Sequence, residues 1–164
     1  MIFKIIFFVL VTICVALFVS MFEDIKKSAR KKISFKEALD LVELPVVTFI
    51  CGNKKLNLLI DTGANNSILN ESVAKSMKLK CQDIEGVDTN TAGGNISLNK
   101  AVNINIKYDD KRVYNEDFLL SNMDEVFESI KEESGVMIHG ILGSNFFIKH
   151  KYIIDYDSLA LYVR

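Results

Sequence analysis

The sequence has little of what metal, nucleotide and nucleic-acid sites require. Its 164 residues include three cysteines and two histidines. The cysteines show neither Cys-x-x-Cys spacing nor histidine companions, so we expect no metal. The 20 basic and 21 acidic residues leave a net charge of −1, which gives no basic surplus for nucleic acid. No glycine cluster is followed by the Lys-Ser/Thr pair of a phosphate loop. We therefore expect no cofactor and no nucleic-acid partner.

The cysteines are Cys14, Cys51 and Cys81. Cys14 lies in an apolar stretch, and spacing does not decide whether Cys51 and Cys81 meet. We expect all three to be free thiols. Tryptophan is absent and there is a single proline, Pro45. This proline stands at the entrance to the first clear strand, where a missing N–H does no harm.

An uncharged apolar run near the N-terminus predicts one membrane-spanning helix. Residues 5–22 contain no charged side chain, and as a helix they are long enough for the hydrocarbon core of a bilayer. A cleaved signal peptide is the alternative, but the run is longer than a usual signal-peptide core and no clean cleavage site follows it. We expect an uncleaved anchor in residues 1–23, a basic juxtamembrane linker and short helix in residues 24–43, and the main domain in residues 44–164.

The charges around the span bear on which side of the membrane the domain faces. Only Lys4 precedes the span. The basic residues that follow it are Lys26, Lys27, Arg30, Lys31 and Lys32. The positive-inside rule favours a cytoplasmic domain, although large domains can cross a membrane whatever their flanking charge. The side therefore stays open, with the cytoplasm favoured.

Turn residues and apolar periodicity predict an all-β domain with short helices. The expected strands are residues 46–50 paired with 55–60, a β region from 86 to 120, and two final strands at 152–156 and 159–163. Short helices are expected at about residues 34–44, 71–77 and 122–134. Asn70 is expected to cap the second helix. In the third, Val126, Phe127 and Ile130 are expected to face inward.

One carboxylate stands where a buried strand ends. Asp61 directly follows the apolar residues 58–60, so it can be partly desolvated and held by N–H groups of the turn. Gly63 permits a backbone angle or a close approach that a Cβ would block. The hydroxyls of Thr62 and Ser67 can orient carboxylates or tie the turn together. The plain alternative is an ordinary turn at the end of a strand.

A second motif lies in residues 136–148, where two apolar residues separate two glycines and Asn145-Phe146 follows. Its Ile141-Leu142-Gly143, together with Asp61-Thr62-Gly63-Ala64, resembles the retropepsin-like aspartic proteases of the bacterial, membrane-anchored, single-domain type. In that family a strand carries Asp-Thr/Ser-Gly-Ala/Ser. A later apolar-apolar-Gly segment packs beneath it before a short helix. The resemblance spans about residues 44–164.

The resemblance implies a retropepsin-like closed barrel and an aspartic endopeptidase that hydrolyses a peptide or protein substrate. This chemistry needs two carboxylates that share a proton, and the chain carries one matching motif. A homodimer in which the two copies of Asp61 meet at a twofold axis is the simplest solution. A membrane anchor would raise the effective concentration of the two copies. Asp155 and Asp157 also follow apolar residues, but they lack Thr-Gly and resemble a polar turn.

The resemblance also implies roles for neighbouring residues. Thr62 would hydrogen-bond to the turn of the second copy, Gly63 would leave room for water and substrate, and Ala64 would keep the outer side of the carboxylates apolar. The residues expected to pack under the turn are Ile141, Leu142 and Gly143. A glycine-bearing hairpin that folds over the substrate would lie at Ala92, Gly93 and Gly94. Its alternative is a plain surface hairpin.

A non-catalytic function competes with the protease. The chain could be a membrane-tethered retropepsin fold used as a dimerisation or peptide-binding module, with the aspartate turn retained as structure. A metal or nucleotide hydrolase has little support, because no second carboxylate or histidine accompanies Asp61 at ligand-like spacing. The sequence does not indicate the preferred substrate sequence or the physiological target.

Overall fold

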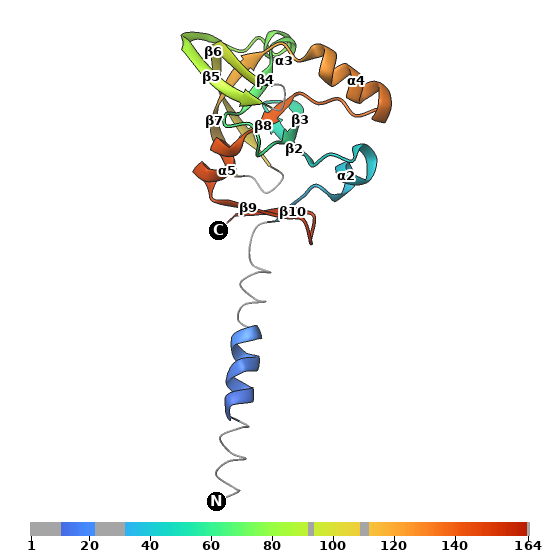
Figure 1. The fold of residues 1–164 in the computed structure, drawn as a ribbon, viewed down its shortest axis with the longest axis vertical. Helices are drawn as coiled ribbons and strands as arrows, with labels where there is room; N and C mark the ends of the chain where they lie inside the picture. Colours follow the sequence, from blue (N-terminus) through green and yellow to red (C-terminus); the bar gives the residue numbers. More distant parts are fainter. Residues whose placement is uncertain (1–10, 22–31, 92–93, 109–111, 164) are drawn as a thin grey trace, which may run out of the picture. The chain divides into compact units, whose positions relative to one another are not determined.

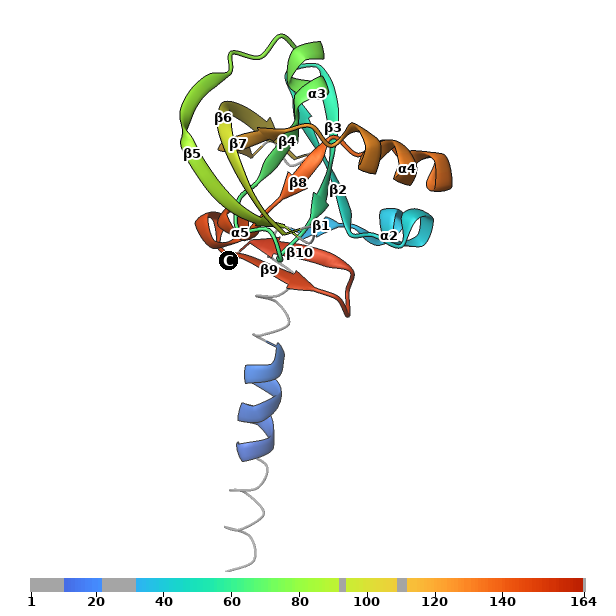
Figure 2. The same ribbon diagram turned by 45° about the horizontal axis from the view of Figure 1, so that its top comes forward.

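The computed structural model describes residues 11–21, 32–91, 94–108 and 112–163. The chain divides into two units, Met1–Lys31 and Lys32–Arg164, which are described separately. The elements of the second unit are β1 (Lys32–Ser34), α2 (Lys36–Val42), β2 (Val46–Cys51), β3 (Lys54–Ile60), β4 (Ile68–Asn70), α3 (Glu71–Ser76), β5 (Gln82–Thr91), β6 (Gly94–Lys107), β7 (Val113–Ser121), α4 (Asp124–Ser134), β8 (Gly140–Leu142), α5 (Ser144–His150), β9 (Tyr152–Asp155) and β10 (Ala160–Val163). Figure 1 labels all of them except β1, which is labelled in Figure 2.

Six of these strands close into a barrel. Neighbouring strands follow the order β2-β3-β8-β4-β7-β6, and β2 pairs back onto β6 at Ile50 and Lys107. β5 continues the sheet beyond β6 as its edge strand. Figure 2 shows β5 and β6 as long curved ribbons on one side of the barrel. The predicted all-β barrel with short helices is confirmed.

Alternating burial explains why these segments form strands. In β3, Leu56, Leu58 and Ile60 are buried and the residues between them are half-buried. β7 alternates in the same way along most of its length. A period of two places one side of each strand in the barrel interior. The predicted pairing of residues 46–50 with 55–60 is confirmed as β2 and β3, joined by a turn in which Gly52 has a φ of 59°.

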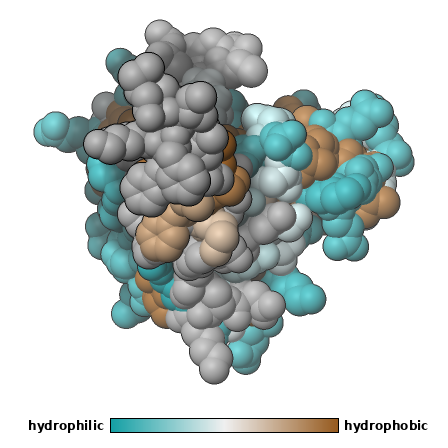
Figure 3. All heavy atoms as spheres, turned by 90° about the horizontal axis from the view of Figure 1, so that it is seen from below, coloured by the Kyte–Doolittle hydropathy of each residue, from teal (hydrophilic) through white to brown (hydrophobic). Residues whose placement is uncertain are grey.

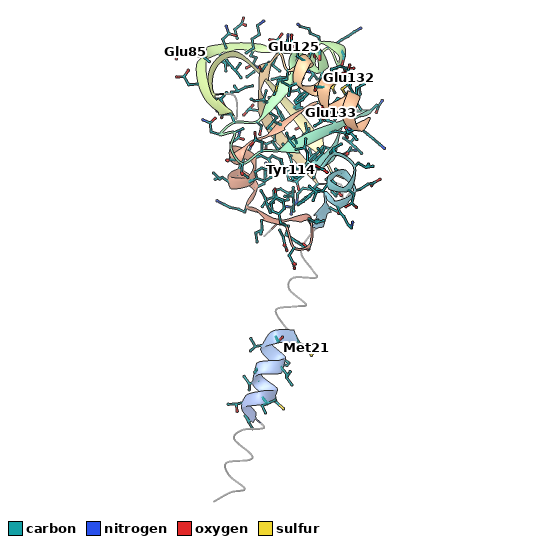
Figure 4. All side chains as sticks on the ribbon, turned by 45° about the vertical axis from the view of Figure 1, so that its right-hand side comes forward. Met21, Glu85, Tyr114, Glu125, Glu132 and Glu133 are labelled. Carbon is teal, nitrogen blue, oxygen red and sulfur yellow. The ribbon has the colours of Figure 1, made fainter. Side chains whose placement is uncertain are left out.

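Aromatic rings fill the barrel interior where β2, β7 and α5 meet. The ring of Phe49 lies 5.9 Å from that of Tyr114 and 6.0 Å from that of Phe146, and the latter two lie 5.7 Å apart. The geometries are edge-on or tilted, as aromatic pairs prefer. Figure 4 shows Tyr114 inside this part of the domain. Beside these rings lies one buried carboxylate, Glu116.

β1, β10 and β9 form a second antiparallel sheet. Strand β1 lies in the range predicted to be only a linker and a short helix. Its backbone pairs with β10 from Lys32 opposite Tyr162 to Ser34 opposite Ala160. Three residues are too few to show a strand periodicity, which is why the sequence did not indicate this strand.

The helices lie where predicted, with two differences in detail. Asn70 is the N-cap residue of α3, as predicted, but its side chain makes no capping hydrogen bond: its Nδ2 donates to Asp124 Oδ1 at 2.8 Å, and its Oδ1 accepts the N–H of Met123 at 3.2 Å. Val126 was expected to face inward but is 55% exposed, whereas Phe127 is buried. Successive helical residues point about 100° apart, and the buried stripe of α4 is narrower than predicted. Figure 3 shows apolar side chains among hydrophilic ones on the side of α2 and α4.

In the N-terminal unit the structure describes residues 11–21, which are helical and exposed. Within the described ranges, no helix is both long enough and apolar enough to cross a membrane. The other residues of the predicted anchor, and residues 24–31 of the predicted linker, lie outside the described residues. The anchor and its orientation therefore stay predictions.

Candidate active site

The two sequence motifs meet at one end of the β3–β8 pair. These strands run parallel and pair residues 58–60 with residues 140–142. The N–H of Asp61 donates to the carbonyl of Leu142 at 3.1 Å, so the ladder continues one residue past β3. Asp61 itself is half-buried. The strand pair thus fixes the backbone of the candidate catalytic residue.

The Asp61 carboxylate is held by its own turn. The N–H of Gly63 donates to Asp61 Oδ1 at 2.8 Å, and the N–H of Ala64 donates to the Asp61 carbonyl at 3.3 Å. A Cβ on Gly63 would lie 3.1 Å from Oδ1, which is closer than ordinary contact. Gly63 is not among the residues with a left-handed φ. Its role is therefore the close approach rather than an unusual backbone angle.

Helix α5 is hydrogen-bonded to the aspartate turn, which comprises residues 61–65. The N–H of Ser144 donates to the carbonyl of Ala64 at 2.8 Å, and its hydroxyl donates to the carbonyl of Thr62 at 2.8 Å. The N–H of Asn145 donates to the carbonyl of Asn65 at 3.3 Å. Ser144 was not among the residues predicted to support the turn. The available indication was its hydroxyl at the first position of a helix that directly follows the second motif.

Ser67 ties the turn to the second motif rather than to the carboxylate. It is fully buried. Its hydroxyl donates to Asn145 Oδ1 at 2.9 Å and accepts the N–H of Gly143 at 3.1 Å. A Cβ on Gly143 would lie 2.4 Å from the carbonyl oxygen of Asn66, so only glycine allows the two segments to cross this closely.

Apolar residues of both motifs fill the space beneath the turn. Ala64 and Ile141 are buried in one cluster, and Leu142 is buried in the main core. Because successive side chains of a strand point to opposite faces, Ile141 and Leu142 lie on opposite faces of β8. Thr62 is exposed. These positions agree with the expected packing, and the catalytic and dimer roles stay predictions.

The predicted hairpin between the motifs is present as β5 and β6. Gly94 begins β6, paired with Thr91, whereas Ala92 and Gly93 lie outside the described residues. Two residues before Thr91, the hydroxyl of Thr89 donates to Asn65 Oδ1 at 2.6 Å. This contact joins the hairpin to the aspartate turn. Neither residue was predicted to make such a contact.

Asp155 and Asp157 lie in a polar turn and not in a second motif of this kind. Asp155 Oδ1 accepts the N–H groups of Asp157 at 2.9 Å and Ser158 at 3.2 Å, which confirms that these acids belong to the polar turn before β10. The cysteines are free thiols, as predicted. Among the described residues, no group of three His, Cys, Asp or Glu side chains is placed to hold a metal ion.

The fold is shared with solved structures of retropepsin-like and retroviral protease-like proteins. A retropepsin-like aspartic protease from Rickettsia conorii is 16% identical, with a TM-score of 0.52 over 82% of this chain and 91% of that one. The retroviral protease-like domain of Ddi1 from Leishmania major is 15% identical, with a TM-score of 0.52 over 73% and 87%. At such identities the likeness establishes the fold, which is a retropepsin-like closed barrel with short helices.

No curated protein matches the chain in sequence. A family model described as "Aspartyl protease" matches residues 47–146. The match covers more than half of the chain and includes both Asp61-Thr62-Gly63-Ala64 and Ile141-Leu142-Gly143. The chain therefore belongs to the aspartyl protease family.

Proposed function

We propose that the protein is an aspartic endopeptidase that is active as a homodimer, with Asp61 of each copy as the catalytic carboxylate. One observation carries the proposal. In a member of the aspartyl protease family, Asp61 stands at the end of β3 with its Oδ1 fixed by the Gly63 N–H at 2.8 Å. A carboxylate oriented before the substrate arrives need not reorganise during the reaction.

Two such carboxylates would divide the work. One accepts a proton from a water molecule, which then attacks the scissile carbonyl carbon. The other, protonated, hydrogen-bonds to the carbonyl oxygen and later supplies a proton for the departing amine. Two carboxyl groups close together share one proton, because like charges at short range oppose double ionisation. The pair therefore begins with one proton, takes a second from the attacking water, and gives one to the departing amine.

The dimer is the simplest source of the second carboxylate. The chain carries one Asp-Thr-Gly motif, and Asp155 is engaged in the turn before β10. An exposed Thr62 beside Asp61 is suited to a contact across a twofold axis. Ala64 and Ile141, buried beneath the turn, would support it from within the same copy.

Replacing Asp61 with Asn tests the enzymatic function. The amide oxygen of Asp61→Asn can still accept the Gly63 N–H, so the chain should fold, but it cannot act as a general base. We expect cleavage of a peptide library by the full chain in mild detergent to fall by about 10²- to 10⁴-fold. Asp157→Asn, in the turn before β10, is the matched control and should cleave normally. Equal cleavage by the Asp61→Asn and wild-type chains would mean that Asp61 is not the catalytic residue, and no cleavage by the wild-type chain would favour the non-catalytic module.

The same variant tests the dimer. Activity of the wild-type chain should rise more steeply than its concentration at low concentration. Excess Asp61→Asn chains should lower wild-type activity by forming mixed dimers. Activity strictly proportional to wild-type chain, with no effect of the variant, would instead require a second carboxylate within one copy.

We also propose that residues 1–23 form a single-pass, uncleaved anchor that leaves the protease domain on the cytoplasmic side. Support comes from the uncharged run of residues 5–22 and the basic residues after it. The full chain should stay with membranes after alkaline extraction, and its N-terminus should be Met1 or the residue that follows. A mature N-terminus just after Ser20 would contradict the anchor. Protection of the domain from protease in inverted membrane vesicles would contradict the orientation.

A further inference from the structure

The hairpin strand β5 has one side chain that differs from its neighbours. β5 lies at the edge of the sheet and pairs with β6. Of the β5 side chains that the structure describes, residues 82–88 are exposed or half-buried, and Thr89 is fully buried. Figure 4 shows Glu85 pointing outward from this strand. A buried hydroxyl needs a hydrogen-bond partner, so the surroundings of Thr89 decide what it does.

Its partner is the aspartate turn. Thr89 Oγ1 donates to Asn65 Oδ1 at 2.6 Å, between residues that are 24 positions apart in the chain. The edge strand is therefore joined to the rest of the domain by this side-chain bond as well as by its ladder with β6. β5 is an edge strand, so its backbone is paired with β6 on one side only. The Thr89–Asn65 bond adds a restraint that this ladder does not provide.

Asn65 is itself firmly placed. Its carbonyl accepts the N–H of Asn145 at 3.3 Å, and the carbonyl of the preceding Ala64 accepts the N–H of Ser144 at 2.8 Å. Asn145 also accepts the hydroxyl of Ser67 at 2.9 Å. The backbone of Asn65 is thus part of the network that fixes Asp61, while its side chain extends to the hairpin.

We propose that the Thr89–Asn65 hydrogen bond is a clasp that sets the position of the β5–β6 hairpin over the aspartate turn, which makes Thr89 and Asn65 positioning residues for the substrate. The effect of the clasp on substrate rests on the proposed protease function, whereas its effect on the position of the hairpin does not. Without the bond, the hairpin samples a wider range of positions. Binding a peptide beside Asp61 then has to restore the order that the clasp provides in advance.

The chain offers a matched set of variants. Thr89→Val keeps the shape and removes the donor, and Thr89→Ser keeps the donor. Thr48 is the distant control, because its hydroxyl donates to Asn57 Oδ1 at 2.9 Å across the β2–β3 pair instead of the hairpin. Thr48→Val therefore removes the same kind of threonine–asparagine bond elsewhere in the barrel.

Amide hydrogen exchange of the full chain measures the clasp without any need for activity. Thr89→Val should speed exchange in residues 84–98 by about three- to tenfold, the loss expected for one hydrogen bond, with no change in β3 and β7. Thr89→Ser should stay near wild type, and Thr48→Val should leave the hairpin unchanged. Unaltered hairpin exchange in Thr89→Val, or the same change in Thr48→Val, would overturn the clasp.

Steady-state cleavage of a peptide identified with the wild-type chain measures the effect on substrate. Thr89→Val should raise KM by about three- to tenfold with kcat within about twofold, and Thr89→Ser should restore most of the difference. A fall in kcat at constant KM, or failure of Thr89→Ser to restore binding, would overturn the positioning role. If the wild-type chain cleaves nothing, the proposed function fails, and hydrogen exchange still decides whether the clasp exists.

Discussion

The two ends of helix α5 are attached to the barrel by different chemistry. At its first turn, Ser144 and Asn145 make neutral hydrogen bonds to the aspartate turn and to Ser67. At its last turn, Lys149 and His150 bind the buried carboxylate of Glu116, with the Lys149 ammonium 3.1 Å away. The first end uses short polar side chains and backbone groups, and the second uses charge.

Each kind of attachment suits its place. Neutral bonds to backbone groups fix geometry and place no additional charge beside Asp61. The Glu116 end lies against the rings of Tyr114 and Phe146, both of which contact His150. There a buried carboxylate needs partners, since desolvation of an unpaired charge is costly. We infer that the first end of α5 positions the site and the second end stabilises the fold.

The largest expected change in stability comes from removing the buried charge of Glu116, which binds the last turn of α5. Glu116→Gln should lower the free energy of unfolding by about 3 kcal/mol, the lower part of the range for a broken buried pair, because the Lys149 side chain can turn to solvent. Urea unfolding of the full chain measures this. Lys149→Met should cost less than about 1 kcal/mol, since its side chain is 51% exposed. Equal losses in the two variants would mean that Glu116 contributes through the lysine rather than through His150.

Breaking the neutral end should have a smaller effect on stability and a larger one on activity. Ser67→Ala leaves the buried Gly143 N–H without its hydroxyl acceptor and removes the hydroxyl donor to Asn145 Oδ1, which keeps the Phe146 N–H as a donor. This should cost about 1–3 kcal/mol. Cleavage should fall further than the loss of folded protein explains, because the turn that holds Asp61 loosens. Urea unfolding and kcat/KM, measured in parallel, test this. Ser158→Ala, at the β9–β10 turn, is the control. Activity that simply follows the folded fraction would assign Ser67 to stability alone.

Much of this arrangement could be predicted from the sequence. Strands β2 and β3 are short apolar runs separated by a turn that contains Gly52 and Asn53, and β6 shows apolar alternation. The Asp61 turn and the second motif are each contiguous in the chain, so their meeting could be expected from family resemblance. These features depend on periodicity and local motifs, which a single sequence displays directly.

The remaining contacts leave no such pattern. Glu116 and His150 are 34 residues apart, and their pairing depends on where α5 crosses β7. Thr89 and Asn65 are two polar residues in polar surroundings, and nothing in the sequence distinguishes them from surface residues. Strand β1 is too short to show periodicity. What the sequence omits is therefore mainly side-chain pairing between distant elements.

The smallest expected effect is a pH dependence of folding stability that arises from His139, next to strand β8. His139 precedes β8. Its ring Nδ1 accepts the backbone N–H of Asn57 at 3.0 Å, and its backbone N–H donates to the Asn57 carbonyl at 2.8 Å. Burial lowers the pKa of His139 below its ordinary value of 6.5. The accepted N–H also requires Nδ1 to be unprotonated, so the folded chain holds the neutral ring.

The sign of the effect follows from this preference. Above about pH 6.5 the ring is neutral in both folded and unfolded chains and adds no pH dependence. As the pH falls below that value, the unfolded chain binds a proton more readily, so stability decreases until the pH reaches the lower pKa of the folded state. The decrease should be modest because the ring is only half-buried. His139→Asn retains an acceptor for the Asn57 N–H and cannot titrate, so urea unfolding between pH 7 and pH 5 should show a shallower loss in this variant. An identical loss in both chains would assign the acid sensitivity to groups other than His139.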